Sequence, residues 1–367
     1  MSAWELYVTD RVGTRQAQLD VYESAEFYAR INDVSTWNVT LPTDTEVGQL
    51  FISDTFARLE IVLDSQVWRS GPVTHLQRTV EIDGDMLEVS GVDDTVWLAR
   101  RLAHPQPATA APPYGTSAYD VHTGTVATVL AELVRVNAGP SAVTARQVPG
   151  LIVPVPAPAG PTITVNARWQ QLLTLMQDTA RPHRLMFDVV DLAFRVYAPQ
   201  DRGVVFSAGL ETLAAWTMTS EAAAANHVVV AGQGEGTARL IREQSNAGSI
   251  GTWGRAETFV DQRQTADPVQ LDKAATEALA AGVKPVTVVF TPLDTDAQAF
   301  GQDWTLGDTV TVMAGGLTVI DQVREVHVTL DDAGATITPS VGAPAGDLAL
   351  FRSLAGLDRR VRQLERI

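Results

Sequence analysis

The chain has 367 residues, of which 45% are hydrophobic and 19% charged, so it is long enough for two or three domains and has the composition of a globular protein. Its formal charge of −16 argues against sequence-specific binding of nucleic acid, because an acidic surface repels phosphate backbones. The chain contains no cysteine, which excludes disulfides, thiolate metal sites and cysteine nucleophiles. The N-terminal sequence lacks a secretory signal, and no apolar run approaches the roughly 18–20 residues of a membrane span, so we expect a soluble protein made in the cytoplasm.

Residues 1 to about 92 are predicted to form short β-strands, because apolar and polar residues alternate there. The predicted strands are Trp4–Val8, Trp37–Leu41, Leu59–Leu63, Thr79–Asp83 and Met86–Ser90. The last two flank Gly84 as a hairpin. Several strands without crossover helices indicate an antiparallel barrel or sandwich. A short helix is predicted over Asp93–Arg101, with acids in its first turn and arginines in its last.

The middle of the chain mixes proline-rich segments with helices. Residues 104–117 are rich in proline and alanine and are the best candidate for a linker, and residues 148–161 are predicted to run extended. A helix is predicted over 126–136. A second helix is predicted over 167–180, with Asn166 as its cap. Its side chains at helical spacing predict one buried stripe, formed by Trp169, Leu172, Leu173 and Met176.

A glycine cluster follows the apolar run Val228–Val230. The glycines are Gly232, Gly234 and Gly236, a G-x-G-x-G pattern, whereas a dinucleotide-binding loop requires G-x-G-x-x-G. A glycine-rich turn or bulge is therefore the preferred interpretation, and no cofactor is expected.

The last third is predicted to begin with a helix and to continue as a small antiparallel β module. Asp267 opens a capping box with proline at the first helical position, and Gly282 ends that helix. Alternating residues between 300 and 342 predict strands joined by turns at Gly315–Gly316 and Asp332–Gly334.

The C-terminal stretch has apolar residues spaced 4, 3, 4, 3, as in the a/d seam of a coiled coil. These residues are Leu350, Leu354, Leu357, Val361 and Leu364. The helix that they predict either packs on its own domain or associates with its copies at a symmetry axis. We favour self-association, because the stretch follows a Gly/Pro linker and carries flanking charges.

No motif for catalysis, cofactor or metal binding is present. The six histidines include no pair spaced i, i+3 or i+4, and there is no H-E-x-x-H, P-loop or G-x-S-x-G sequence. The stretch 205–209 comes closest to a nucleophile elbow but lacks its first glycine. Four aspartates near one predicted turn are expected to be solvated acids, namely Asp83, Asp85, Asp93 and Asp94.

Four segments, in matching order, resemble the tail hub family of long-tailed phages, the baseplate hub or tail-tip proteins found especially in phages of actinobacteria. The segments lie at residues 87–102 (LEVSGVD to LARRL), 232–239 (GQGEGTAR), 253–261 (WGRAE to Asp261) and 300–308 (FGQDWTLGD). Together they place the resemblance over residues 4 to 345. The resemblance implies two β-barrel-like domains per chain and three chains closing into a ring with pseudo-sixfold symmetry, which would cap the hexameric end of the tail tube.

On this basis the expected fold is mainly β (α+β), with two hub domains at 1–105 and 201–345, a mixed peripheral domain at 106–200 and a short helix at 346–367. The expected partners are two further copies of the chain, the hexameric distal tail protein or tail tube, the tape-measure protein, and downstream tail-tip or receptor-binding proteins. The expected location is the virion.

The resemblance implies a structural role without catalysis. Many longer relatives continue into a peptidase or fibre-like region beyond the position of Ile367, so no lytic activity is expected. Two alternatives stay open. One is a tail-associated cell-wall hydrolase with Asp93 or Glu257 as acid or base, since carboxylate pairs meet only in the fold. The other is the hub of a phage-derived injection device.

Overall fold

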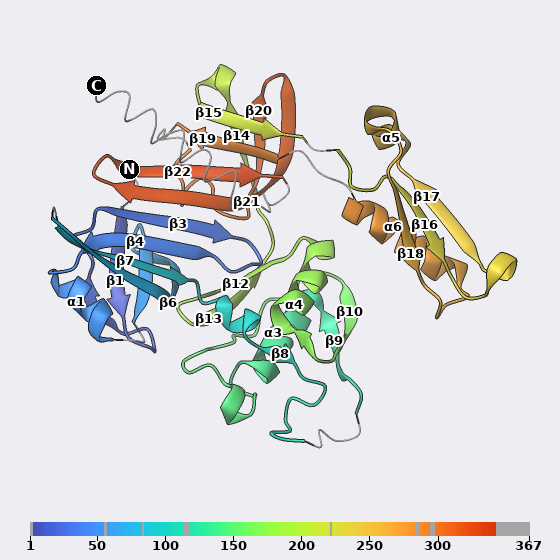
Figure 1. Ribbon diagram of the computed structural model, residues 1–367, viewed down its shortest axis with the longest axis horizontal. Coiled ribbons are helices and arrows are strands. Elements are labelled where there is room, and N and C mark those ends of the chain that lie inside the picture. Colours follow the sequence, from blue (N-terminus) through green and yellow to red (C-terminus); the bar gives the residue numbers. More distant parts are fainter. Residues whose placement is uncertain are drawn as a thin grey trace. The chain divides into compact units, whose positions relative to one another are not determined.

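The computed structural model describes residues 3–54, 57–82, 84–112, 117–220, 222–282, 287–293 and 298–342. By contacts the chain divides into two compact units (Figure 1). Unit 1 comprises Met1–Trp216 and Val289–Val341, and unit 2 comprises Thr217–Val288 with Gly342–Ile367. Strands dominate the described residues, which confirms the mainly β prediction. The barrel shape and the domain boundaries proposed above remain predictions.

One sheet of 13 strands forms most of unit 1. Its strands are β1 (Trp4–Thr9), β2 (Arg15–Gln18), β3 (Ser24–Arg30), β4 (Thr36–Pro42), β5 (Arg58–Leu63), β6 (Gln66–Glu81), β7 (Gly84–Val92), β14 (Asp201–Ser207), β15 (Leu213–Thr219), β19 (Thr287–Pro292), β20 (Thr309–Ala314), β21 (Leu317–Asp331) and β22 (Gly334–Val341). The main path runs β15-β19-β22-β21-β3-β4-β7-β6-β5-β1-β2, and β20 joins β14 to β21. The five predicted N-terminal strands and both predicted C-terminal hairpins are confirmed.

The sheet contains one five-strand pattern twice. The first repeat is ordered β3-β4-β7-β6-β5, and the second is ordered β15-β19-β22-β21-β20, with corresponding strands in the same chain order. The β6–β7 hairpin closes at Glu81↔Gly84, and the β21–β22 hairpin closes 250 positions later, at Asp331↔Gly334. The irregularities in strand pairing also correspond. The register of the β6–β7 pairing shifts after Val73, and the register of the β21–β22 pairing shifts 250 positions later, after Val323.

The two repeats are joined directly by strand pairing and by aromatic packing. Strand β21 pairs antiparallel with β3, and the two lie side by side in Figure 1. Ring contacts lead from Trp68 on β6 to Phe290 on β19: Trp68 to Phe300 at 5.8 Å, Phe300 to Trp304 at 4.9 Å, Trp304 to Phe206 at 5.3 Å, and Phe206 to Phe290 at 4.8 Å. These large rings bury much apolar surface, so the repeats share one core.

The middle part of unit 1 has its own core, built on two helices. Its elements are α3 (Val126–Asn137), α4 (Leu172–Ala180), β8 (Leu102–Ala103), β9 (Asp120–Thr125), β10 (Thr162–Ala167), β11 (Gln170–Gln171), β12 (Met186–Val190) and β13 (Ala193–Tyr197). Two further short helices of unit 1 are α1 (Glu46–Ser53) and α2 (Val96–Ala99). The helix predicted over 126–136 is confirmed as α3.

Two predicted helices begin later than their sequence patterns indicate. The helix predicted over 167–180 begins at Leu172, because β10 pairs with β9 as far as Ala167 and so takes up Asn166, the predicted cap. Trp169 adopts a left-handed φ of 52° and is 40% exposed, so it is not part of the buried stripe, whereas Leu172 is. The helix predicted over Asp93–Arg101 is reduced to α2, of four residues.

Unit 2 is a three-stranded sheet covered by one helix. Strand β16 (His227–Ala231) lies between β17 (Ile241–Ser245) and β18 (Glu257–Asp261), antiparallel to the first and parallel to the second. The helices are α5 (Ala247–Trp253) and α6 (Pro268–Gly282). The core is small and consists of Val228, Val230, Leu271 and Ala275. The predicted cap is confirmed for Asp267, whose Oδ1 accepts a hydrogen bond from the Val269 amide at 2.9 Å. The Asp267 amide donates to Thr265 Oγ1 at 3.1 Å, and not to Gln270 as a capping box requires.

Candidate functional site

Asp93 and Asp94 are buried, and the expectation that they are solvated turn acids is wrong. Asp94 is fully buried, and its Oδ2 accepts hydrogen bonds from Arg58 Nη2 and Ser70 Oγ, both at 2.6 Å. Asp93 is 2% exposed, and its Oδ1 accepts from the Thr95 amide at 3.2 Å. Burial raises the pKa of Asp93 to about 7, although the charge of Arg69 opposes the shift. The two carboxylates therefore belong to the interior of unit 1 and lie away from any polymer at its surface.

The other two aspartates of that group differ from this pair. Asp85 lies on the β6–β7 hairpin and forms a two-bonded ion pair with Arg78, whose hydrogen bond lowers the pKa of Asp85 to about 2. It is thus a paired surface acid. Asp83 lies outside the described residues.

A third buried carboxylate, Asp188 on β12, joins the middle part of unit 1 to the first repeat. Arg195 donates two hydrogen bonds to it, each of 2.8 Å, and Tyr197 donates a third at 2.9 Å. Arg69 of β6 lies 3.6 Å away. Burial opposes ionisation of Asp188, but the hydrogen bonds from Arg195 and the nearby arginine charges outweigh it and lower the pKa of Asp188. This network is a charged joint between β6, β12 and β13.

Glu257, the other proposed acid or base, lies in unit 2. It is exposed on β18, and its Oε1 accepts a hydrogen bond from Arg255 Nε at 2.6 Å. Its ion pair is local, with a partner two residues earlier in the chain, whereas Asp94 pairs with an arginine 36 residues away.

The glycine cluster in unit 2 is a turn, as predicted. Gly234 and Gly236 have φ values of +114° and +53°, and the chain returns as β17, antiparallel to β16. A dinucleotide loop would lead into a helix. Gly232 is also constrained, because a Cβ there would lie 2.8 Å from a Leu271 methyl group. These glycines let the backbone turn against α6.

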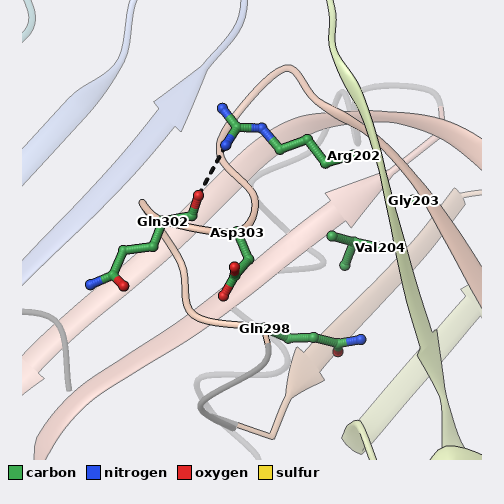
Figure 2. Close-up of a pocket in the computed structure, with 6 residues that line it drawn as sticks. All are labelled: Arg202, Gly203, Val204, Gln298, Gln302 and Asp303. Atoms are coloured by element: carbon green, nitrogen blue, oxygen red, sulfur yellow. Dashed lines mark hydrogen bonds between the residues drawn. The ribbon is translucent and has the colours of Figure 1, made fainter.

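The FGQDWTLGD segment is partly buried and lies beside a small pocket of about 300 Å³. Trp304 is 1% exposed and donates a hydrogen bond from Nε1 to the main-chain oxygen of Gln298 at 3.0 Å. Asp308 accepts a hydrogen bond from the Thr305 amide at 3.0 Å. Figure 2 shows Arg202 extending from β14 toward the main-chain oxygen of Gln302, to which it donates at 2.9 Å. The lining residues are Arg202, Gly203, Val204, Gln298, Gln302 and Asp303.

The only carboxylate among these six, Asp303, accepts from the Ala299 amide at 2.8 Å. The lining polar groups thus hold the loop to β14, and this pocket offers no acid and base pair. Ser207, the serine of the elbow-like stretch, is buried, and its Oγ accepts from the Gly209 amide at 3.2 Å. It is a turn residue.

A larger pocket, of about 620 Å³, lies beside the charged joint and is lined in part by Trp68, Arg69, Arg195 and Tyr197. Its arginines already pair with Asp188. Within the described ranges no group of three or more histidines and carboxylates could hold a metal ion. In the same ranges no helix is both long and apolar enough to cross a membrane.

Two strand edges of unit 1 are further candidates for a functional surface. From Val73 to Glu81, β6 pairs with β7 alone among the described strands, and β15 ends the sheet path with β19 as its neighbour. Sequence motifs do not reveal these edges, because the edges follow from strand order in the sheet. The predicted seam from Leu350 to Leu364 lies outside the described residues and remains a prediction.

The chain is similar to known phage tail proteins in sequence and in fold. The family model described as Siphovirus ReqiPepy6 Gp37-like protein matches residues 5–343. A tail protein from Neisseria meningitidis MC58 superposes with a TM-score of 0.60 at 14% identity, covering 93% of this chain and 97% of that one. The 43 kDa tail protein of prophage MuSo2 from Shewanella oneidensis gives 0.60 at 12% identity, covering 92% and 97%.

Prophage tail protein gp18 from Listeria monocytogenes EGD-e gives a TM-score of 0.55 at 9% identity, covering 97% and 99%. No curated protein sequence matches the chain. The resemblance to tail proteins of long-tailed phages is confirmed by the family match and by the shared fold. The chain belongs to the Siphovirus ReqiPepy6 Gp37-like protein family and has the fold of phage tail proteins.

Proposed function

We propose that the protein is a structural hub of the phage tail, a homotrimer that caps the distal end of the tail tube. The internal repeat carries this proposal. Each chain offers the same five-strand pattern twice, 250 residues apart, so three chains offer it six times. A closed ring of three such chains would match a sixfold tube end through similar contacts at every position.

The proposed partners follow from that position. The ring would bind the hexameric distal tail protein or tail tube on one side and tail-tip or receptor-binding proteins on the other, and it would meet the tape-measure protein at the lumen. Each chain carries a charge of −16. Like charges repel, so such a ring would let DNA pass without adhering to it. The proposed location is the tail tip of the virion.

We propose that the role is non-enzymatic. The two carboxylates considered for acid or base catalysis are in the interior or in an ion pair: Asp93 is 2% exposed, and Glu257 is bound to Arg255. Incubation of the purified protein with host cell walls in a zymogram should leave the walls intact. Clearing of the gel would overturn this part of the proposal.

The solution mass of the purified chain tests the ring. One chain has a mass of 39.4 kDa, so light scattering should report about three times that value. Removing residues 346–367 tests the predicted C-terminal seam separately: a fall to monomer would assign closure to that seam, and an unchanged trimer would assign it to unit 1. A monomer at every concentration, together with virions that lack the protein at the tail tip in immunogold micrographs, would refute the hub.

A further inference from the structure

The pocket beside the charged joint combines an apolar wall with two arginines. Its volume of about 620 Å³ lies within the range typical of ligand sites. Trp68 and Leu306, which are 9% and 3% exposed, supply part of the apolar wall, and Arg69 and Arg195 lie in the same lining. Sites for small ligands commonly have this composition, in which apolar side chains surround a few polar groups. The polar groups then decide which ligand fits.

The guanidinium of Arg69 is buried with donors that no described residue satisfies. Its side chain is 7% exposed, and its one hydrogen bond to a described residue runs from Nη1 to the main-chain oxygen of Trp68, at 2.7 Å. Its Nε is buried and has no acceptor in the described part of the chain. Asp188 lies 3.6 Å from Nη1, which is too long for a good hydrogen bond. Because unmet donors in the interior are costly, this arginine has capacity for a further acceptor.

The buried carboxylates near Arg69 do not supply that acceptor. Asp188 already accepts two hydrogen bonds of 2.8 Å from Arg195 and one of 2.9 Å from Tyr197. Burial raises the pKa of Asp93 to about 7, so Asp93 carries only part of a negative charge at neutral pH. The one full negative charge of Asp188 therefore lies between two arginine charges, and positive charge is in excess at this end of the pocket.

The carboxylate among the described lining residues, Asp64, is engaged elsewhere. Its Oδ1 accepts a hydrogen bond from the Ala3 amide at 2.8 Å, and its Oδ2 accepts one from Gln302 at 3.2 Å. The ion pairs of Arg69 and Arg195 run to Asp188 instead. The pocket thus presents an acid whose oxygens are used and arginines with donors left over.

We propose that this pocket binds a carboxylate that is attached to an apolar body. The carboxylate would lie on Arg69 and Arg195, because the N–H groups of a guanidinium match the oxygens of a planar carboxylate. The apolar body would lie against Trp68 and Leu306, which a bare inorganic anion would leave exposed to water. Two sources offer this chemistry, a small aliphatic carboxylic acid and the carboxyl-terminal residue of a polypeptide. The site belongs to one chain, so it does not depend on the ring proposed above.

Calorimetric titration of the full chain with isocaproate tests this chemistry. Two matched compounds each change one feature: isocaproamide keeps the apolar body and lacks the charge, whereas acetate keeps the charge and lacks most of the apolar body. Each should bind at least about tenfold more weakly than isocaproate. Equal binding of the amide would overturn the role of the arginines. Equal binding of acetate would overturn the role of the apolar wall and indicate an adventitious ion only.

The dipeptide acetyl-alanyl-leucine, with a free carboxyl terminus, distinguishes the two sources. Tighter binding of the dipeptide than of isocaproate would assign the site to a polypeptide chain end, and binding of isocaproate alone would assign it to a small acid. In the first case the amidated dipeptide should bind at least about tenfold more weakly than the free acid. Failure of both carboxylates to bind would overturn the proposal.

Two substitutions in the lining test whether the ligand occupies this pocket. Arg195→Gln removes one guanidinium and should weaken the binding of isocaproate about tenfold or more. Gln66→Glu adds a negative charge at an exposed position of the lining, away from the charged joint, and should weaken binding about two- to fivefold at low salt. Gln18→Glu is the matched control, because Gln18 is exposed on β2 and lies outside the described lining, and it should leave the affinity unchanged.

Circular dichroism confirms that each variant is folded before its affinity is compared. Unchanged affinity of folded Arg195→Gln and Gln66→Glu would overturn the assignment to this pocket. Light scattering of the same samples keeps this site separate from the ring. A trimer that binds neither carboxylate overturns the site and leaves the ring standing, whereas a monomer that binds isocaproate as described supports the site and counts against the ring.

Discussion

Replacing Asp93 with asparagine should stabilise unit 1 at alkaline pH and have little effect at acid pH. The folded pKa of Asp93 is about 7, against 3.8 for an exposed aspartate, because burial disfavours the carboxylate. A carboxyl whose pKa is raised on folding favours the folded state fully below the unfolded pKa, and this contribution is lost as the pH rises through the folded pKa. The affected window is therefore about pH 4 to 7.

The magnitude follows from the size of the shift. A shift of about 3 units at roughly 1.4 kcal/mol per unit corresponds to a loss on the order of 4 kcal/mol between pH 4 and pH 7. Asparagine is neutral at every pH and can keep the hydrogen bond that Asp93 Oδ1 accepts from the Thr95 amide. At pH 8 the Asp93→Asn variant should therefore melt on the order of 10 °C above the natural protein.

Thermal melts followed by circular dichroism at pH values from 5 to 9 provide the assay. Burial also raises the pKa values of Asp308 and Glu325, so the difference between variant and natural protein isolates Asp93. The neighbouring substitution Asp94→Asn is the control. It should lower the melting temperature at pH 8, because it leaves the buried Arg58 guanidinium without its carboxylate. If the Asp93→Asn curve ran parallel to that of the natural protein, the assigned cause would be wrong.

Three further substitutions test the packing described above. Gly91→Ala should lower the free energy of unfolding by about 1–3 kcal/mol in urea titrations, because its Cβ would lie 2.1 Å from the Trp37 ring, and an unchanged midpoint would contradict that clash. Arg195→Ala leaves Asp188 without its two-bonded partner and should cost about 1–3 kcal/mol at neutral pH, because Arg195 is 46% exposed and Arg69 remains 3.6 Å from Asp188; the loss should be smaller in acid, where Asp188 is protonated. Leu271→Ala removes a fully buried side chain from the small core of unit 2 and should cost about 2–5 kcal/mol there. Limited proteolysis of that variant should cleave within residues 217–288 and spare unit 1, whereas uniform digestion of the whole chain would contradict two separate cores.

Local signals predicted most of the strands and the helix that begins after Asp267. Alternation and turn glycines act over a few residues, so Gly84 and Gly334 each locate a hairpin without help from distant contacts. The start of α4 was missed for the opposite reason. Asn166 has the side chain of a helix cap. Its backbone is instead part of β10, which pairs with β9, more than 40 residues earlier in the chain.

Burial of charge could not be predicted from spacing. Asp94 follows a strand in a stretch typical of a solvated turn, and its arginine, Arg58, is 36 residues away. The same holds for Asp188 and Arg69, which come from different parts of unit 1. The unpaired edge of β6 is still less visible in sequence, because it is defined by the absence of a neighbour that β21 has.

The position of unit 2 in the chain has a consequence for symmetry. In the first repeat, β3 and β4 are joined by the five residues 31–35, whereas in the second repeat the whole of residues 220–286 stands between β15 and β19. An insertion between adjacent strands leaves their pairing intact, whatever its length. Because only one repeat carries it, an assembly of three chains would display six copies of the sheet pattern and three copies of unit 2. Such an assembly would present sixfold contacts through its sheets and threefold contacts through its insertions.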